Sequence, residues 1–218
     1  MQAATNFTGT EEIAKFISEK NVKILNLCHL PEDSRLKTLS FAAANHKRIY
    51  EILELGERVD GSSLFSFIEP GRSDIYIMPR LDRVFTNRFS NTPALNIMCD
   101  YLGEDGKPLD VAPRNVLRRA EEKLHSSSGV VLNALAELEF YIISKPNTDV
   151  LFPSAADKNY HESAPFARFE DLRNEILVTL SSVGVASKYG HSEVGRIQGK
   201  DGSLMEQHEV EFVPQKLT

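Results

Sequence analysis

One stretch of the chain, Leu135–Ile143, limits the possible folds more than any other. It is apolar, rich in aromatic and branched side chains, and free of Gly and Pro, which predicts a β-strand. Successive side chains of a strand point to opposite faces of the sheet. Glu137 and Glu139 therefore share one face, side by side. The other face is expected to form core, and it carries Leu138, Phe140 and Ile142.

Two carboxylates on one face of an apolar strand repel each other and lose hydration when they are buried. Such a pair is typical either of a strand with one solvated face or of oxygen ligands for a hard cation. A second segment, Glu209–Phe212, repeats the pattern, and Gly190–Val194 adds Glu193. Acids on several strand-like segments predict a convergent cluster, which a cation or a proton makes tolerable.

The chain carries five short motifs whose order along the sequence is informative. They are Asp60–Ser63 with Ser73-Asp74 and Met78-Pro79, Ala112–Ala120, Glu137–Phe140, His191–Val194 and Gln207–Phe212. On these motifs, from about Val22 onward, the chain resembles the glutamine synthetases, in which similar motifs follow one another in this order.

The resemblance implies an α+β protein in two parts. Residues 1–110 would form a β-grasp-like domain. Residues 111–218 would form the first part of the catalytic domain, a curved antiparallel sheet with helices that carries the metal-binding strands. The sequence stops just after an expected core strand, so we expect it to be the front part of a longer protein and inactive alone.

The resemblance also implies a reaction, in which an ATP-dependent ligase makes glutamine from glutamate and ammonia through a γ-glutamyl phosphate. Mg²⁺ or Mn²⁺ would be the cofactor, ATP the co-substrate, and the complete protein a homo-oligomeric ring with active sites between subunits. Two alternatives stay open: a related ligase that joins glutamate to an amine, and a truncated, non-catalytic binding or assembly module.

Carried over by position, the resemblance assigns metal ligands. Glu139, Glu193 and Glu209 would hold one ion, and Glu137 would help to hold a second. From the residues alone, His191 is expected at the surface, and Glu211 fits a solvated face and receives no role.

Two further positions receive roles by resemblance. Asp60 would take a proton from ammonium across a subunit interface, and Tyr160 would lie near the nucleotide and substrate pocket. By their local sequence alone, Asp60 fits a turn and Tyr160 an ordinary loop residue. The chain departs from the family pattern at Ser192, Lys188 and the long segment between Glu193 and Glu209, which leaves the substrate and nucleotide geometry open.

Composition excludes several classes of protein. The net charge of −6 gives no electrostatic reason to expect nucleic-acid binding. No apolar run approaches the roughly 18 residues of a membrane span, and the first residues do not resemble a signal peptide. Cys28 and Cys99 form neither a metal pattern nor a disulfide framework, so the expected compartment is the cytoplasm.

Apolar periodicity and turn residues predict the remaining elements. The expected helices are one capped by Thr8 or Thr10 and ending near Asn21, then Lys47–Leu55, then Pro113 to about Leu124 with a break at Ser126–Gly129, and finally Phe169–Val183. The expected strands are Val22–Leu30, Leu36–Phe41, Ile75–Met78, Leu95–Tyr101 and parts of Val130–Ile143. The last helix is expected to pack through Phe169, Leu172, Ile176 and Leu180, and Gly199–Ser203 to form a hairpin tip.

Overall fold

The computed structural model describes residues 7–145, 152 and 156–217, and these form two compact units. The first unit runs to Leu132 and includes Leu217, and the second spans Asn133–Lys216. Both mix helices and strands, which confirms the α+β class. The predicted domain boundary near Asp110 stays a prediction. The compact units separate later because the helix after Asp110 bonds to the first unit.

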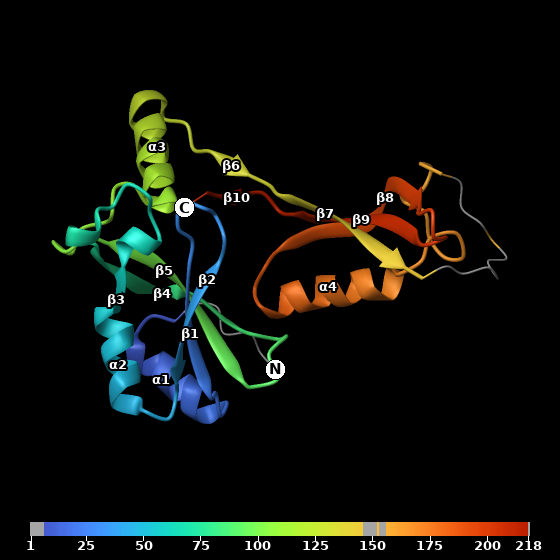
Figure 1. Cartoon of the computed structure of the whole chain (residues 1–218). Helices are drawn as coiled ribbons and strands as arrows, with labels where there is room; N and C mark the ends of the chain where they lie inside the picture. Colours follow the sequence, from blue (N-terminus) through green and yellow to red (C-terminus); the bar gives the residue numbers. More distant parts are fainter. Residues whose placement is uncertain (1–6, 146–151, 153–155, 218) are drawn as a thin grey trace. The chain divides into compact units, whose positions relative to one another are not determined.

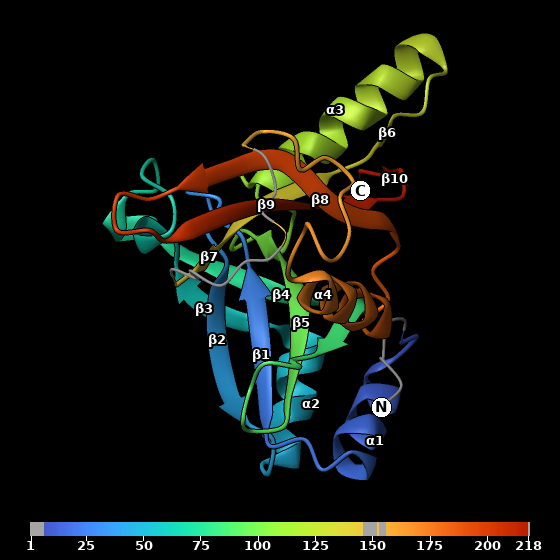
Figure 2. The same cartoon turned by 90° about the vertical axis from the view of Figure 1, so that its right-hand side faces the viewer.

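A five-stranded mixed sheet forms the first unit, in the order β2-β1-β5-β4-β3 (Figures 1 and 2). Strands β1 and β5 are parallel, and the other neighbours are antiparallel. The strands are β1 (Ile24–His29), β2 (Lys37–Ala42), β3 (Glu57–Asp60), β4 (Asp74–Thr86) and β5 (Ala94–Leu102). The helices are α1 (Thr10–Glu19), α2 (His46–Leu55), α3 (Pro113–Ser128) and the short 3₁₀ turns η1 (Gly61–Ser63) and η2 (Pro70–Arg72).

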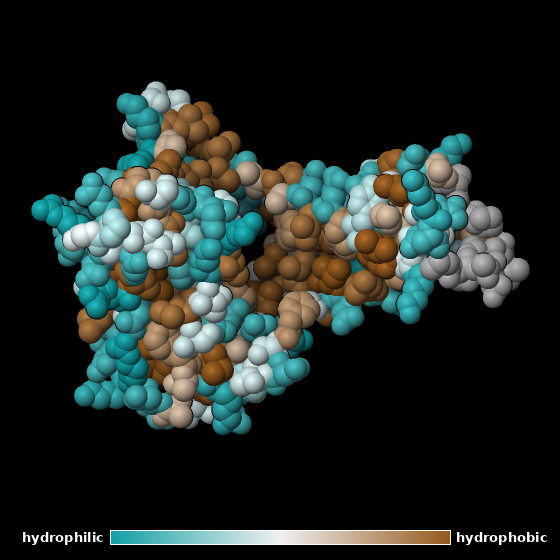
Figure 3. Space-filling view, viewed as in Figure 1, coloured by the Kyte–Doolittle hydropathy of each residue, from teal (hydrophilic) through white to brown (hydrophobic). Residues whose placement is uncertain are grey.

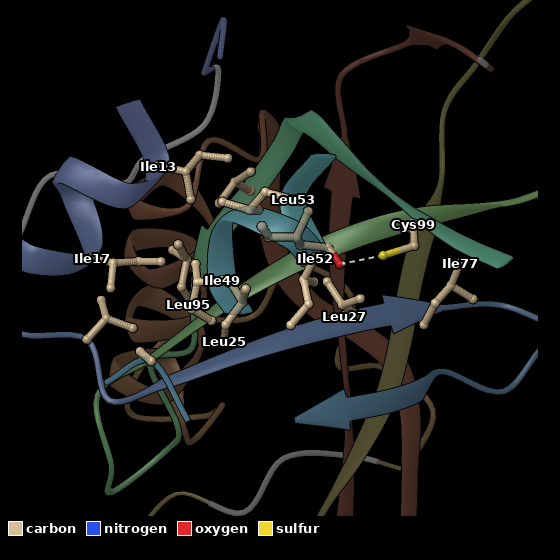
Figure 4. Close-up of a cluster of buried hydrophobic side chains, with 14 of the residues drawn as sticks. Ile13, Ile17, Leu25, Leu27, Ile49, Ile52, Leu53, Ile77, Leu95 and Cys99 are labelled. Atoms are coloured by element: carbon tan, nitrogen blue, oxygen red, sulfur yellow. Dashed lines mark hydrogen bonds between the residues drawn. The ribbon is translucent and has the colours of Figure 1, made fainter. Parts of the chain in front are cut away.

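The core of this unit lies between the sheet and the helices α1 and α2. Apolar side chains spaced three or four residues apart in the helices meet alternate residues of the strands. Figure 4 shows them converging from Ile13, Ile17, Leu25, Leu27, Ile49, Ile52, Leu53, Ile77 and Leu95. The Cys99 thiol donates to the carbonyl of Ile97 at 3.5 Å at the margin of this cluster. Helix α1 contributes Ile13 and Ile17 as its buried residues.

Two helix ends differ from the expectation. Helix α1 begins after Gly9, so the predicted cap by Thr8 or Thr10 is wrong. The backbone N–H of Thr8 instead donates to Glu12 Oε2 at 2.8 Å. Helix α3 continues through the serines expected to break it, and Ser128 Oγ donates to the carbonyl of Leu124 at 2.7 Å. Gly129, in the left-handed region, ends the helix. None of the helices in the described residues is long and apolar enough to cross a membrane.

The second unit is built on a three-stranded antiparallel sheet in the order β7-β9-β8. Its elements are β7 (Glu137–Ser144), α4 (Glu170–Ser182), β8 (Ser187–Gln198), β9 (Leu204–Phe212) and the small pair β6 (Asn133–Ala134) and β10 (Gln215–Lys216). Helix α4 lies along this sheet and contacts β8 and β9 (Figure 1). The predicted hairpin tip at Gly199–Ser203 is confirmed, since the Gly199 N–H donates to the Ser203 carbonyl at 2.8 Å.

The expected apolar packing in this unit is wrong in two places. Leu138 is 50% exposed, although it was expected in the core, and Leu172 on α4 is 42% exposed. Within the fully described helix α4, the buried residue is Arg173. The helix therefore packs on the sheet through a polar contact and leaves apolar side chains at the surface, which Figure 3 shows in brown on this unit.

Gly56 offers a test of the turn between α2 and β3. It ends α2 with φ +72°, and an added Cβ would lie 2.5 Å from the carbonyl oxygen of Ile77 on β4. Gly106 has the same φ, but an added Cβ there meets no atom within 4 Å. Gly106→Ala should cost about 1 kcal/mol for the left-handed conformation alone. Gly56→Ala should cost at least about 2 kcal/mol more, measured by urea unfolding. Equal losses in the two variants would show that the β4 backbone yields to the new methyl group.

Candidate metal centre

Strand pairing in the second unit places the acidic residues on one face of the sheet. Glu137 lies opposite Glu211, and Glu139 lies opposite Glu209. On the other side of β9, His191 of β8 also lies opposite Glu209. Directly opposed residues share a face. We call this surface the acidic face, and it comprises Glu137, Glu139, His191, Glu193, Glu209 and Glu211.

Glu209 is the central group of the acidic face. It is 6% exposed, and its neighbour His191 is 9% exposed, so the expected surface position of His191 is wrong. Strand β9 is the middle strand, which explains why its side chains are covered while Glu137 and Glu139 on the edge strand β7 remain exposed.

The carboxyl of Glu209 has a raised pKa. Burial is the largest cause, a hydrogen bond with Glu193 adds to it, and the charge of Glu137 acts in the same direction. His191 opposes them, with its Nε2 3.7 Å from Glu209 Oε2 and its Nδ1 3.7 Å from Glu193 Oε2. The protein thus holds a carboxyl where its negative charge is poorly compensated, which is the electrostatic condition for binding a cation or a proton.

Two overlapping groups of potential ligands meet at this carboxyl. One is His191, Glu193 and Glu209, and the other is Glu137, Glu209 and Glu211. Within each group, the ligand atoms lie within 4.8 Å of one another. The all-carboxylate group fits a hard ion such as Mg²⁺ or Mn²⁺, and the imidazole of the other group suits Mn²⁺ better than Mg²⁺. The residues present therefore fit the metal that the resemblance implies.

The sequence-based ligand set and the structural groups overlap without being identical. Glu137, Glu193 and Glu209 each belong to a group. Among the described residues, Glu139 joins neither, because its Oε2 accepts a hydrogen bond from Gln207 Nε2 at 2.6 Å. The ligand role of Glu139 stays a prediction.

Sequence reasoning gave Glu211 no role, yet it faces two partners. Lys188 Nζ lies 2.7 Å from Glu211 Oε2. Hydrogen bonds from Lys188 and Tyr189 lower the pKa of Glu211, and the same contact with Glu211 raises the pKa of Lys188. The sequence signal for this pair was the basic Lys188 itself, five residues before Glu193.

Tyr160 lies beside the acidic face. Its ring stacks on His161 at 4.0 Å between centroids, and His191 lies edge-on to it at 5.3 Å. Its side chain is 56% exposed, so the ring can contact a bound molecule. The role of Tyr160 in nucleotide or substrate binding stays a prediction.

The opposite face of the same sheet carries a second charged layer, which sequence reasoning missed. Glu206 is fully buried, and its Oε2 accepts from Arg168 Nε at 2.9 Å. His208 is also fully buried, and its Nδ1 lies 3.0 Å from Arg173 Nη1 of α4. Because Nδ1 must accept from the guanidinium, His208 is held neutral, and burial together with Arg173 lowers its pKa to about 4.

Asp60 belongs to the first unit, at the end of the edge strand β3, and it is exposed as expected. Its carboxylate accepts from the Ser62 N–H at 3.0 Å and from the hydroxyls of Ser62 and Ser63, each at 2.7 Å. Hydrogen bonds from the neighbouring serines, Ser63 first, lower its pKa to about 2. Asp60 is therefore a fixed, ionised carboxylate, and its catalytic role stays a prediction.

Comparison with known proteins shows which family this chain resembles. Residues 110–216 match the model of the glutamine synthetase catalytic domain. A glutamine synthetase of Thermotoga maritima is 30% identical over 93% of this chain, and one of Methanococcus maripaludis is 27% identical over 93%. The chain is similar to glutamine synthetases over most of its length, and residues 110–216 resemble their catalytic domain.

Solved structures show the same fold. A glutamine synthetase of Plasmodium falciparum superposes on 99% of this chain with a TM-score of 0.76 at 18% identity. A GmaS structure in complex with ADP superposes on 93% with a TM-score of 0.68 at 16% identity. The chain spans about 44% of the length of its two curated glutamine synthetase relatives and 46% of the Plasmodium chain. The fold expected from the resemblance, with a β-grasp-like part and the first part of a catalytic domain, is thus that of solved glutamine synthetases. This chain covers less than half of the length of the Plasmodium structure.

His208 makes the stability of the second unit depend on pH. Its pKa is about 4 in the folded state, below the usual 6.5, so the folded chain binds fewer protons between these values. His208 therefore contributes stability above pH 6.5, and this contribution is lost as the pH falls toward 4. By this linkage, the free energy of unfolding should be about 2 kcal/mol lower at pH 5 than at pH 7 because of His208.

The measurement is urea unfolding at both pH values in the presence of EDTA, with His208→Gln as the matched control. Glutamine has an oxygen that can accept from Arg173 but does not titrate. The pH-dependent loss should shrink by about 2 kcal/mol in the variant. An unchanged loss would place the titrating group elsewhere.

Proposed function

We propose that this chain forms the metal-binding front part of an ATP-dependent glutamine synthetase. The observation that carries the proposal is the buried Glu209, at which two groups of cation ligands meet. In the proposed reaction, the γ-phosphoryl group of ATP passes to the side-chain carboxylate of glutamate, and ammonia then displaces phosphate. This family reaction is supported by the relatives, which are glutamine synthetases.

In this proposal the cation is Mg²⁺ or Mn²⁺, held by Glu193 and Glu209 with His191, and by Glu137 and Glu209 with Glu211. The predicted ligand Glu139 would bind the cation only after breaking its hydrogen bond with Gln207. Bound metal supplies positive charge that neutralises phosphoryl oxygens. The protein contributes the Glu209 carboxyl, which is buried and has little positive charge near it. A bound cation would therefore stabilise its ionised form strongly.

Asp60 and Tyr160 are proposed to serve the substrates. Asp60 is a carboxylate at an exposed sheet edge, where a neighbouring subunit of a ring could present ammonium to it. Three serine hydrogen bonds orient it and keep it ionised at every physiological pH. Tyr160 offers an exposed aromatic face beside His191, suitable for stacking against a bound substrate or nucleotide. The free, buried thiols Cys28 and Cys99 support a reducing, cytoplasmic setting.

The metal part of the proposal predicts that Mn²⁺ and Mg²⁺ raise the melting temperature of the chain relative to EDTA. An ion that binds only the folded state stabilises it by about 2.7 kcal/mol at a hundred times its dissociation constant. Glu209→Gln should abolish the rise, because both ligand groups lose their shared member. Mn²⁺ should act at lower concentration than Mg²⁺ because of the imidazole.

Two matched variants sharpen the melting experiment. Glu206→Gln removes an equally buried glutamate on the opposite face, so its response to metal should match that of wild type. Glu139→Gln tests the predicted ligand that the structure pairs with Gln207, and a reduced response would establish that Glu139 changes partner. A full metal response in Glu209→Gln would refute the site.

The reaction itself predicts that these 218 residues alone release no phosphate that depends on both glutamate and ammonia. Positioning and charge stabilisation are nearly all of phosphoryl-transfer catalysis, and the chain covers 44% of its Thermotoga relative. A chimera that adds the uncovered part of that relative should synthesise glutamine. Asp60→Asn should abolish synthesis in the chimera while changing its melting temperature little, since Asn can also cap η1.

The assay follows phosphate release and glutamine formation, with methylamine offered in a parallel reaction. Synthesis by the unextended chain would contradict the claim that it is incomplete. A folded chimera with the same synthesis rate before and after Asp60→Asn would remove Asp60 from the catalytic residues. A clear preference for methylamine would assign an amine ligase instead.

A further inference from the structure

The first unit contains a cavity of about 370 Å³ that the proposed ligase chemistry does not use. It is formed by the end of β1, by β4 and β5, and by the first turn of α3. Its size lies within the range of small-molecule sites. The acidic face belongs to the second unit, so the cavity is built from separate residues.

Three arginines line this cavity: Arg80, Arg83 and Arg114. Two carboxylates pair with them, which leaves one positive charge in excess. Arg114 Nη1 donates to Asp100 Oδ2 at 2.7 Å. Arg80 and Arg83 both approach a single oxygen, Oδ2 of Asp82, at 3.3 and 3.1 Å.

Arg80 is the least exposed of the three, with 19% of its side chain accessible. Burial is the main cause that lowers its pKa, and repulsion from Arg114 is the second. A partly buried guanidinium that faces a second guanidinium is stabilised by an anion placed between or beside them. The arginine cluster therefore favours an occupant with one negative charge.

The rest of the wall is apolar. Leu30, Met98 and Leu117 line the cavity, together with the buried ring of Tyr101. Helix α3 also begins at this wall, with Ala112 as its N-cap, so the N-cap side chain satisfies none of the first N–H groups there. The positive end of the helix dipole adds to the preference for an anion, while the apolar wall favours a hydrocarbon body.

We propose that this cavity binds a small organic monocarboxylate with an apolar body. The carboxylate would contact the guanidiniums of Arg80 and Arg83, whose only shared counter-charge among the described contacts is the half-exposed Asp82. The apolar body would lie against Leu30, Met98 and Leu117. Inorganic phosphate and acetate share the negative charge but lack that body, so they should bind weakly.

The test is calorimetric titration of the 218-residue chain with 4-methylpentanoate, at low ionic strength because salt screens the charges. Saturable binding with one site is expected. The neutral isostere 4-methylpentanamide and acetate should each bind at least tenfold more weakly, and so should phosphate. No saturable binding of 4-methylpentanoate below 10 mM, or equal affinity for the amide, would overturn the proposal. Equal affinity for phosphate or acetate would refute the claim that the apolar wall contributes to binding.

Variants locate the site. Arg83→Gln changes a half-exposed side chain and leaves the Arg114–Asp100 pair intact, so the fold is expected to persist, which a melting curve checks. It should weaken 4-methylpentanoate at least fivefold, as should Arg80→Gln. The control is Arg72→Gln in η2, an exposed arginine outside the cavity, which should not change the affinity. An equal loss in Arg72→Gln, or full affinity in both Arg83→Gln and Arg80→Gln, would exclude the cavity as the binding site.

Discussion

A buried carboxyl on the middle strand of a three-stranded sheet is the constraint on which the second unit depends. Glu209 has acidic neighbours on both flanking strands. Its position on the middle strand β9 shields it from the water that solvates exposed carboxylates. His191 is the one nitrogen group of its own face that lies within 4 Å of it among the described ion pairs. A folded state with this carboxyl ionised needs positive charge from elsewhere, which is why we expect metal binding and stability to be linked.

Strand β9 also carries charge on its other face, where the protein supplies the compensation itself. Arg168 pairs with Glu206, and Arg173 of α4 bonds to His208. On one face of β9 the charge of Glu206 is paired with the fixed guanidinium of Arg168, and we propose that a bound cation compensates Glu209 on the other face. The contact between Arg173 and His208 holds β9 against α4 on the face opposite Glu209, so the strand can present Glu209 and Glu211 despite their mutual repulsion.

The sequence was informative where one local pattern governs the structure, and less so where partners come from distant segments. Alternation in Glu137–Phe140 and Glu209–Phe212 predicted which side chains share a face, because that depends on the strand alone. The burial of His191 was missed, because the rings of Tyr160 and His161, which pack against it, come from a distant segment. The role of Glu211 was missed for the same reason, as Lys188 reaches it from β8. On α4, apolar periodicity predicted a core face, but Arg173 took the inward position because β9 presents His208 there.

The pair formed by Lys188 and Glu211 bears on which ligand group is favoured. Lys188 already gives Glu211 a positive partner at 2.7 Å, so a cation that used Glu211 would have to displace that contact or share it. The group of His191, Glu193 and Glu209 has no lysine or arginine among its described ion-pair partners, and its one potential cation is an imidazole that can instead act as a neutral ligand. By this argument we propose that a first ion would be held beside His191, and that Glu137 and Glu211 would help to hold a second one only when another group, such as a phosphate, offsets the ammonium charge of Lys188. Lys188, where the chain departs from the family pattern, would then change the order in which the ions bind and leave the first site intact.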